Sequence, residues 1–165
     1  MKVVKDIYNW VGQKIPEFTL ENTRGEWTNI KDFQNKKNVV ILLIRGLMCP
    51  VCRQHLIRLA QDLDKFKELD TEVYVVTADR FENARRLELV YIKGKFPIYF
   101  DKEHEVVKLL KQDVKILQLG RLPAILIVDK EGMIQYAYYG SSFLDIPSNR
   151  QLIRTLKKIE GKEVR

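Results

Sequence analysis

Apolar residues divide the chain into alternating candidate strands and helices. The continuous, β-branched run at residues 39–44 is typical of a strand that is buried on both faces of a sheet. Residues 72–78 have the same character. Between them, apolar residues recur at helical spacing over residues 50–69, with Leu56, Leu59 and Phe66 on one face. Two strands separated by one helix predict a parallel, right-handed βαβ unit.

Shorter elements precede and follow this unit. Residues 20–28 contain a glycine turn between residues of strand type, which predicts a short hairpin, and Thr28 is expected to cap a short helix over 29–33. The further predicted elements, in chain order, are a helix from residue 80 to just before Gly94, a strand at 97–101, a helix at 103–111, antiparallel strands at 124–128 and 133–139, and a closing helix with the apolar stripe Leu152, Ile153, Leu156 and Ile159.

This order of elements predicts an α/β fold with a central mixed sheet flanked by helices, and the N-terminal β-hairpin is an extension of it. The 165 residues, 45% of them hydrophobic, suit a single domain over residues 1–165, because no linker or repeat divides the chain. The charged N-terminal residues lack the apolar core of a signal peptide, and no later apolar run approaches membrane-spanning length. We therefore expect a soluble, cytoplasmic protein with no membrane partner.

The formal net charge of +7 raises the question of a nucleic-acid partner. Lysine and arginine recur along the whole chain with aspartate and glutamate between them, and no nucleic-acid motif or aromatic-basic platform is present. The densest basic stretch, residues 80–95, is typical of the polar face of a helix. We expect no specific nucleic-acid partner, although the net field can steer acidic partners toward the protein.

The two cysteines of the chain, Cys49 and Cys52, stand three residues apart where the first buried strand gives way to the long helix. A Cys-x-x-Cys at such a junction is typical of a redox motif. Pro50 suits the first helical position, so Cys49 is predicted to be the N-cap, where the helix dipole lowers the pKa of a thiol. Cys49 is therefore the candidate nucleophile. Cys52, in phase with the apolar stripe of the helix, is the candidate resolving thiol and is expected to be more buried.

Other interpretations of the same residues remain open. Arg45 and Arg53 flank the pair and would favour a thiolate by Coulomb attraction, or they are ordinary exposed charges. The cysteines could instead form an inert structural disulfide, although a bridge over so short a loop removes little entropy from the unfolded chain. A zinc site would need four ligands, for which the chain offers the cysteine pair and its two histidines, His55 and His104.

Four segments in the right order give a resemblance to the peroxiredoxin-like branch of the thioredoxin fold, the alkyl hydroperoxide reductase and thiol-specific antioxidant (AhpC/TSA) family. Residues 15–20, Ile-Pro-Glu-Phe-Thr-Leu, look like its opening strand. Residues 45–53 resemble its Arg-Gly-x-x-Cys-Pro-x-Cys-Arg segment. Residues 75–79 are similar to the strand that ends in aspartate after the active-site helix, and residues 122–132 to the last sheet hairpin. The resemblance covers nearly the whole chain.

The resemblance implies a thioredoxin-like fold and a function based on thiols, with no metal and no organic cofactor. It also implies that Pro123 follows a cis peptide bond beside the cysteines, where an extended substrate can pair with the backbone. The chain departs from the peroxiredoxin pattern Pro-x-x-x-Thr/Ser-x-x-Cys, because Leu42 and Gly46 occupy the two positions if Cys49 reacts with peroxide. If Cys52 reacts instead, Arg45 and Cys49 occupy them. Arg121 or Arg45 could supply the positive group of a peroxide site.

These features predict a thiol-disulfide oxidoreductase in which Cys49 attacks and Cys52 resolves, with protein disulfides or a thioredoxin-type reductant as partners. The alternative is a peroxidase that reduces hydrogen peroxide or alkyl hydroperoxides through Cys49 or Cys52. A third hypothesis, from another class, is a non-catalytic binding module whose basic surface meets an acidic partner. The oligomeric state is not predicted.

Overall fold

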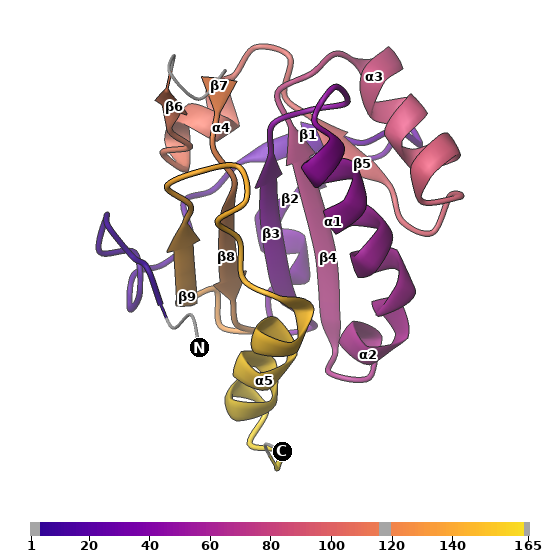
Figure 1. The fold of residues 1–165 in the computed structure, drawn as a ribbon. Helices are drawn as coiled ribbons and strands as arrows, with labels where there is room; N and C mark the ends of the chain where they lie inside the picture. Colours follow the sequence, from indigo (N-terminus) through magenta and orange to yellow (C-terminus); the bar gives the residue numbers. More distant parts are fainter. Residues whose placement is uncertain (1–3, 116–119, 164–165) are drawn as a thin grey trace.

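The computed structural model describes residues 4–115 and 120–163, and its centre is a five-stranded mixed sheet (Figure 1). The strand order is β5 (Ile98–Phe100), β4 (Thr71–Thr77), β3 (Asn38–Ile44), β8 (Ala124–Val128) and β9 (Ile134–Tyr139). β3, β4 and β5 are parallel, whereas β8 is antiparallel to both β3 and β9. The predicted mixed sheet, the parallel βαβ unit and the C-terminal hairpin are therefore confirmed.

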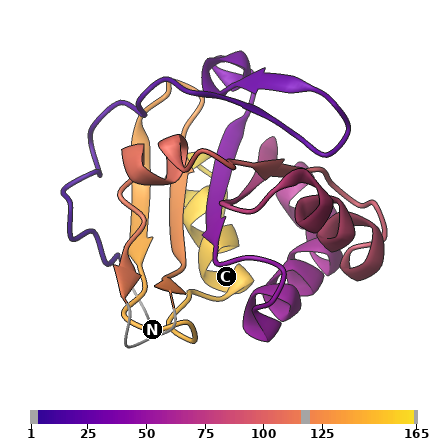
Figure 2. The ribbon, with the colours of Figure 1, turned by 90° about the horizontal axis from the view of Figure 1, so that it is seen from above.

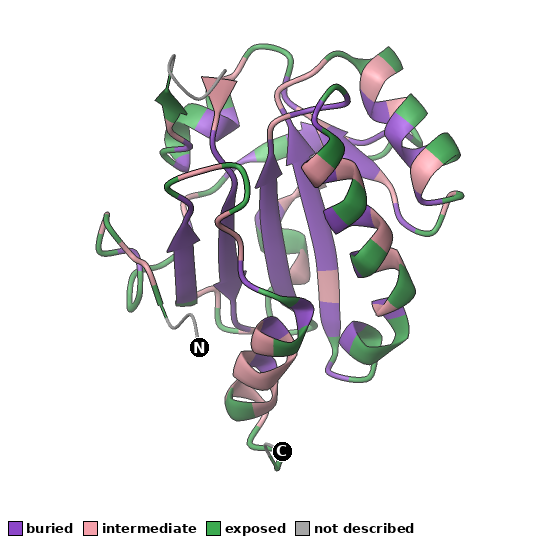
Figure 3. Cartoon of the chain, viewed as in Figure 1, coloured by how far each residue is buried: buried purple, intermediate pink, exposed green. Residues whose placement is uncertain are grey.

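Both faces of the sheet are covered, which explains the unbroken apolar run of β3. Val40, Leu42 and Ile44 face one hydrophobic cluster, and Val39, Ile41 and Leu43 face the other. The first face is packed against α1 (Pro50–Gln61), α2 (Leu63–Lys67), α3 (Phe81–Arg86) and α5 (Asn149–Ile159). Figure 3 shows the result as a buried sheet beneath helices whose outer surfaces are exposed.

The second face is covered by α4 (Glu105–Leu109) and the N-terminal segment, seen from above in Figure 2. That segment includes the predicted hairpin, β1 (Thr19–Glu21) with β2 (Trp27–Asn29), and the 3-10 helix η1 (Ile30–Phe33). The cap of η1 is Asn29 rather than Thr28: the Asn29 side chain accepts a hydrogen bond from the Lys31 amide at 2.9 Å. Thr28 is instead paired within β2, and its hydroxyl accepts from Tyr99.

The predicted continuous helix over 50–69 is wrong, because the helix is interrupted at Asp62 between α1 and α2. The first residue of α5, Asn149, lies against this interruption. Its Nδ2 donates to the Arg58 carbonyl and to the Asp62 carboxylate, both at 3.0 Å. A side chain that binds a backbone carbonyl and a carboxylate at this point stabilises the break.

Two further elements differ from the prediction. The helix that begins near residue 80 is α3 followed by a π-helical turn, η2 (Leu87–Tyr91), in which the buried Glu88 carboxylate accepts from Arg24 and Arg85. The sequence also did not predict the small sheet formed by β6 (Val114–Lys115) and β7 (Gly120–Arg121). No helix in the described ranges is both long and apolar enough to cross a membrane.

Candidate active site

Cys49 occupies the N-cap of α1, as the Cys-Pro sequence predicts. Its backbone is extended, with φ −89° and ψ 107°, and Pro50 follows within the first helical turn. The amide of Cys52 donates a hydrogen bond to the Cys49 sulfur at 3.2 Å. A helix N-terminus leaves such amides without partners inside the helix, so the sulfur receives a donor and the positive end of the helix dipole together.

The two thiols are free and lie in direct contact. The Cys52 sulfur donates a hydrogen bond to the Cys49 sulfur, and the two atoms are 2.6 Å apart. This hydrogen bond is the main reason why the pKa of Cys49 is lowered to about 6, and the attraction of Arg45 adds to the effect. The same contact, together with burial, raises the pKa of Cys52. The pair therefore contains one thiolate near neutral pH and one thiol that holds its proton.

The expected difference in burial between the cysteines is small: Cys49 is 7% exposed and Cys52 is 6% exposed. They differ in what they face. Both cysteines belong to the hydrophobic cluster beneath α1, but Cys49 also lines a cavity of about 550 Å³, which Cys52 does not. Access to the cavity therefore distinguishes the nucleophile from the resolving thiol.

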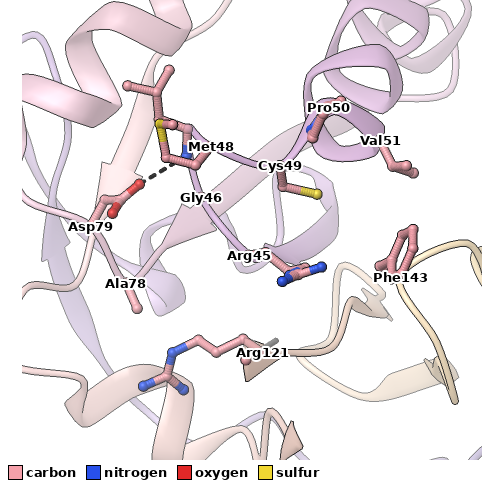
Figure 4. Close-up of a pocket in the computed structure, with 12 residues that line it drawn as sticks. Arg45, Gly46, Met48, Cys49, Pro50, Val51, Ala78, Asp79, Arg121 and Phe143 are labelled. Carbon is pink, nitrogen blue, oxygen red and sulfur yellow. Dashed lines mark hydrogen bonds between the residues drawn. The ribbon is translucent and has the colours of Figure 1, made fainter. Parts of the chain in front are cut away.

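The cavity has a polar end and a second end that holds the Cys49 sulfur (Figure 4). Asp79 and Arg121 lie at one end, and Val51 and Phe143 lie near the sulfur of Cys49 at the other. Met48, which is 84% exposed, belongs to the rim. The further lining residues are Arg45, Gly46, Leu47, Pro50, Ala78 and Gly120.

The three predicted arginines have different positions. Arg45 lines the cavity, and its guanidinium lies 5.5 Å from the centre of the Phe143 ring. Arg121 lines the polar end and contacts His104. Arg53 points instead toward Tyr91, to whose hydroxyl it donates at 3.0 Å, and it does not line the cavity. The structure thus places Arg45 and Arg121, but not Arg53, in the lining of the cavity that Cys49 faces.

The prediction of a cis bond before Pro123 is wrong, because no described residue follows a cis peptide bond. With this bond in the trans form, the Leu122 amide donates to the Asp113 carbonyl, and the Leu122 carbonyl accepts from the Gln112 side chain at 3.0 Å. Trans is also the ordinary state of such bonds. Pro123 is buried and is not one of the cavity-lining residues.

Comparison with known proteins identifies the family. The family model described as AhpC/TSA matches residues 11–137. The chain belongs to the AhpC/TSA family. A peroxiredoxin of Nanoarchaeum equitans is 28% identical over 156 residues, covering 89% of this chain and 69% of the relative. A thiol-disulfide oxidoreductase ResA of Bacillus thuringiensis is 26% identical over 149 residues, covering 90% and 78%.

The fold of this AhpC/TSA protein also matches solved structures. The reduced 2-Cys peroxiredoxin of Plasmodium vivax superposes with a TM-score of 0.82 at 20% identity, covering 93% of this chain and 83% of that one. The predicted thioredoxin-like fold and the predicted family are therefore confirmed, and so is the broad class of thiol-dependent oxidoreductase.

The sequence did not identify Asp79 as a residue of the site. Its carboxylate accepts a hydrogen bond from the Leu47 amide at 3.0 Å and thereby holds the turn that leads to Cys49. Gly46 makes this close approach possible, because its φ is +146° and a Cβ at this position would lie 2.6 Å from the Asp79 carboxylate. The available signal was that Asp79 follows β4, whose carboxyl end lies beside that of β3.

The residues of the alternative zinc site are not assembled. His55 is 3% exposed, and burial lowers its pKa to about 4. His104 binds Arg121 and the Ala78 carbonyl. Within the described ranges, no three His, Cys, Asp or Glu side chains are grouped so that they could hold a metal ion. The interaction of His104 with Arg121 is a second feature of the site that the sequence did not indicate.

Proposed function

We propose that this AhpC/TSA protein is a thiol-disulfide oxidoreductase. The observation that carries the proposal is the contact between two thiols of unlike acidity, of which only Cys49 faces the cavity. A thiolate attacks and a neighbouring thiol resolves, so this arrangement provides both groups that disulfide exchange needs.

The reaction proceeds in two exchanges. The Cys49 thiolate attacks one sulfur of a substrate disulfide, a new sulfur–sulfur bond forms, and one substrate thiolate leaves with the electron pair. Cys52 then loses its proton and attacks the Cys49 sulfur, which expels the second substrate thiolate. The substrate is reduced to two thiols, and the protein is oxidised to the Cys49–Cys52 disulfide. A thiol reductant of the thioredoxin type returns the protein to the dithiol form.

The form of the site favours disulfide exchange over peroxide reduction. Gly46 replaces the hydroxyl residue of the peroxiredoxin pattern and has no side chain that could bind a peroxide. A cavity of about 550 Å³ with an exposed Met48 on its rim has room for a substrate much larger than hydrogen peroxide. We therefore propose protein disulfides as substrates, in the cytoplasm expected from the sequence.

Peroxide reduction is the second candidate, and the relatives support it because peroxiredoxins occur among them. In this reaction the Cys49 thiolate would attack one peroxide oxygen, form a sulfenic acid and release water or an alcohol. Cys52 would then attack the sulfenic sulfur, which breaks the sulfur–oxygen bond, releases water and forms the same disulfide. Arg45, which already favours the Cys49 thiolate, is the positive group available beside the sulfur.

A trapping experiment tests the proposal. Cys52→Ser should accumulate a mixed disulfide between Cys49 and a disulfide protein such as insulin, whereas wild type should release reduced insulin. Cys49→Ser is the matched control and should do neither. If Cys52→Ser gives no adduct and wild type reacts with insulin no faster than a free thiol, the proposal fails.

The second measurement is the rate of oxidation of the reduced protein by hydrogen peroxide, followed by intact mass. A rate that exceeds that of a free thiol by orders of magnitude, with no insulin adduct, would make peroxide reduction the function. If both reactions occur only at the rate of a free thiol, the binding-module hypothesis replaces the proposed enzyme.

A further inference from the structure

Arg121 is a half-buried cation at the polar end of the Cys49 cavity. Burial lowers the pKa of its guanidinium, since part of the water around the charge has been removed. Within the described ranges, no carboxylate lies close enough to Arg121 to form an ion pair. A guanidinium that has lost part of its hydration and forms no ion pair with a carboxylate can bind an anionic group of a ligand favourably.

His104 holds this guanidinium in place. Its Nε2 lies 3.1 Å from the Ala78 carbonyl oxygen, which can only accept, so Nε2 must carry the proton. In the neutral ring, Nδ1 is then an acceptor, and it lies 2.9 Å from Nη2 of Arg121. His104 therefore positions Arg121 through one nitrogen while the other is fixed to the end of β4. The Arg121 donors that His104 does not use remain for a ligand.

The cavity lining carries two cations, Arg45 and Arg121, and one carboxylate, Asp79. Asp101 attracts Arg121 from a distance, and its carboxylate accepts from the Glu105 and Val107 amides. Asp79 also lines the cavity, but its carboxylate is bound to the Leu47 amide. Arg45 adds a second cation beside Cys49. Figure 4 shows the Arg121 guanidinium directed away from the Cys49 sulfur, so the anion would lie at some distance from the reacting bond.

We propose that Arg121 is an anion subsite that receives a carboxylate of the disulfide substrate while Cys49 attacks its sulfur. This inference rests on the proposed function and adds the chemical class of the substrate, a disulfide flanked by an acidic group. An acidic residue near the cysteine of a protein substrate would supply that group. Arg45 is a poorer candidate for a separate subsite, since it acts directly on the Cys49 thiolate.

Two small aromatic disulfides allow a direct test. Dithiobis(nitrobenzoate) carries a carboxylate on each ring, and dithiodipyridine is uncharged near neutral pH. With either probe, Cys49 displaces one aromatic thiolate, and Cys52 loses a proton and displaces the second, leaving the protein disulfide. Both probes release a product that is followed by its absorbance. The measured quantity is the ratio of the two second-order rate constants, that of the anionic probe over that of the neutral probe.

Arg121→Gln should lower this ratio about tenfold, as expected for the loss of one charge-assisted hydrogen bond. In Arg121→Lys the ratio should fall less, because lysine keeps the positive charge but lacks the planar guanidinium that can donate two parallel hydrogen bonds. His104→Asn should lower the ratio less than Arg121→Gln. Asparagine is chosen because it tolerates the left-handed backbone at this residue, where φ is +61°. Arg150→Gln, an exposed arginine on α5, is the matched control and should keep the wild-type ratio.

The outcomes separate the subsite from the proposed function. An unchanged ratio in Arg121→Gln, or an equal decrease in Arg150→Gln, would overturn the subsite. The pH midpoint of Cys49 alkylation serves as a second measurement, because Arg121 is not among the groups that lower the Cys49 pKa. A shifted midpoint in a folded Arg121→Gln protein would mean that the site itself has been distorted, and would count against the subsite. If wild type reacts with both probes only as fast as a free thiol, the proposed function fails instead.

Discussion

At the scale of single residues, the acidity of Cys49 depends mainly on one hydrogen bond, and that bond comes from Cys52. Exchange at this site therefore needs Cys52 twice. It first stabilises the attacking thiolate and then becomes the attacking group. The raised pKa of Cys52 keeps its proton in place until Cys49 has reacted.

We predict that the pH dependence of Cys49 alkylation reports this hydrogen bond. In wild type, the alkylation rate should rise with pH through a midpoint near 6, because the thiolate is the nucleophile and its pKa is lowered to about 6. Cys52→Ala removes the donor, so its midpoint should move upward by at least about one pH unit. Cys52→Ser keeps a hydroxyl donor and should lie between wild type and Cys52→Ala. Equal midpoints in all three proteins would contradict this origin of the low pKa.

The cysteine pair was predictable from the sequence because its signals are local. Cys49 precedes a proline at the start of a helix, and a buried strand precedes both. The hydrogen bonds of Asp79 to Leu47 and of His104 to Arg121 connect residues 32 and 17 positions apart, so no local pattern indicates them. The bond before Pro123 was predicted wrongly from a family resemblance, since the state of a peptide bond depends on the contacts around it.

At the scale of elements, the interruption between α1 and α2 shows how a distant residue alters a helix. The apolar stripe continues through Asp62, and Leu63 and Phe66 are buried as the stripe requires. The contact that stabilises the break comes from Asn149, 87 residues later in the chain. Periodicity therefore predicted the buried face correctly but not the division into two helices.

Asn149→Ala should destabilise the protein by about 1–2 kcal/mol, because it removes hydrogen bonds to the Arg58 carbonyl and the Asp62 carboxylate in a partly buried place. Urea unfolding of the reduced protein measures this free energy. Arg150→Ala, the exposed neighbour on the same helix, is the control and should change stability by less than about 0.5 kcal/mol. A loss in Arg150→Ala as large as that in Asn149→Ala would show that α5 itself, rather than its contact with α1, is responsible.

At the scale of the whole molecule, the sheet brings the functional residues together from distant parts of the chain. The parallel arrangement of β3 and β4 places the turn before Cys49 beside Asp79. The antiparallel β8 begins at Ala124, three residues after Arg121, so its pairing with β3 brings this arginine to the same edge. The order of element types predicted a mixed sheet, but it did not determine that β8 would lie beside β3, which is what completes the cavity.

The net charge of +7 belongs to the whole molecule and acts over longer distances than Arg121. We predict that the reaction with dithiobis(nitrobenzoate) slows several-fold between about 0.01 M and 0.5 M salt, because the Debye length falls well below its low-salt value of about 30 Å. The reaction with the neutral dithiodipyridine should change little. Stopped-flow measurement of both rates across the salt series provides the check.

The salt series also distinguishes the long-range field from the subsite. Arg121→Gln lowers the net charge by one of seven, so it should retain most of the salt dependence while reacting more slowly with the anionic probe at every salt concentration. If this variant loses the salt dependence altogether, the attraction of the anionic probe would come from the charges of the cavity rather than from the net charge of the whole surface. If wild type shows no salt dependence with the anionic probe, the net charge plays no part in its encounter with acidic substrates, and their selection would depend on contacts inside the cavity.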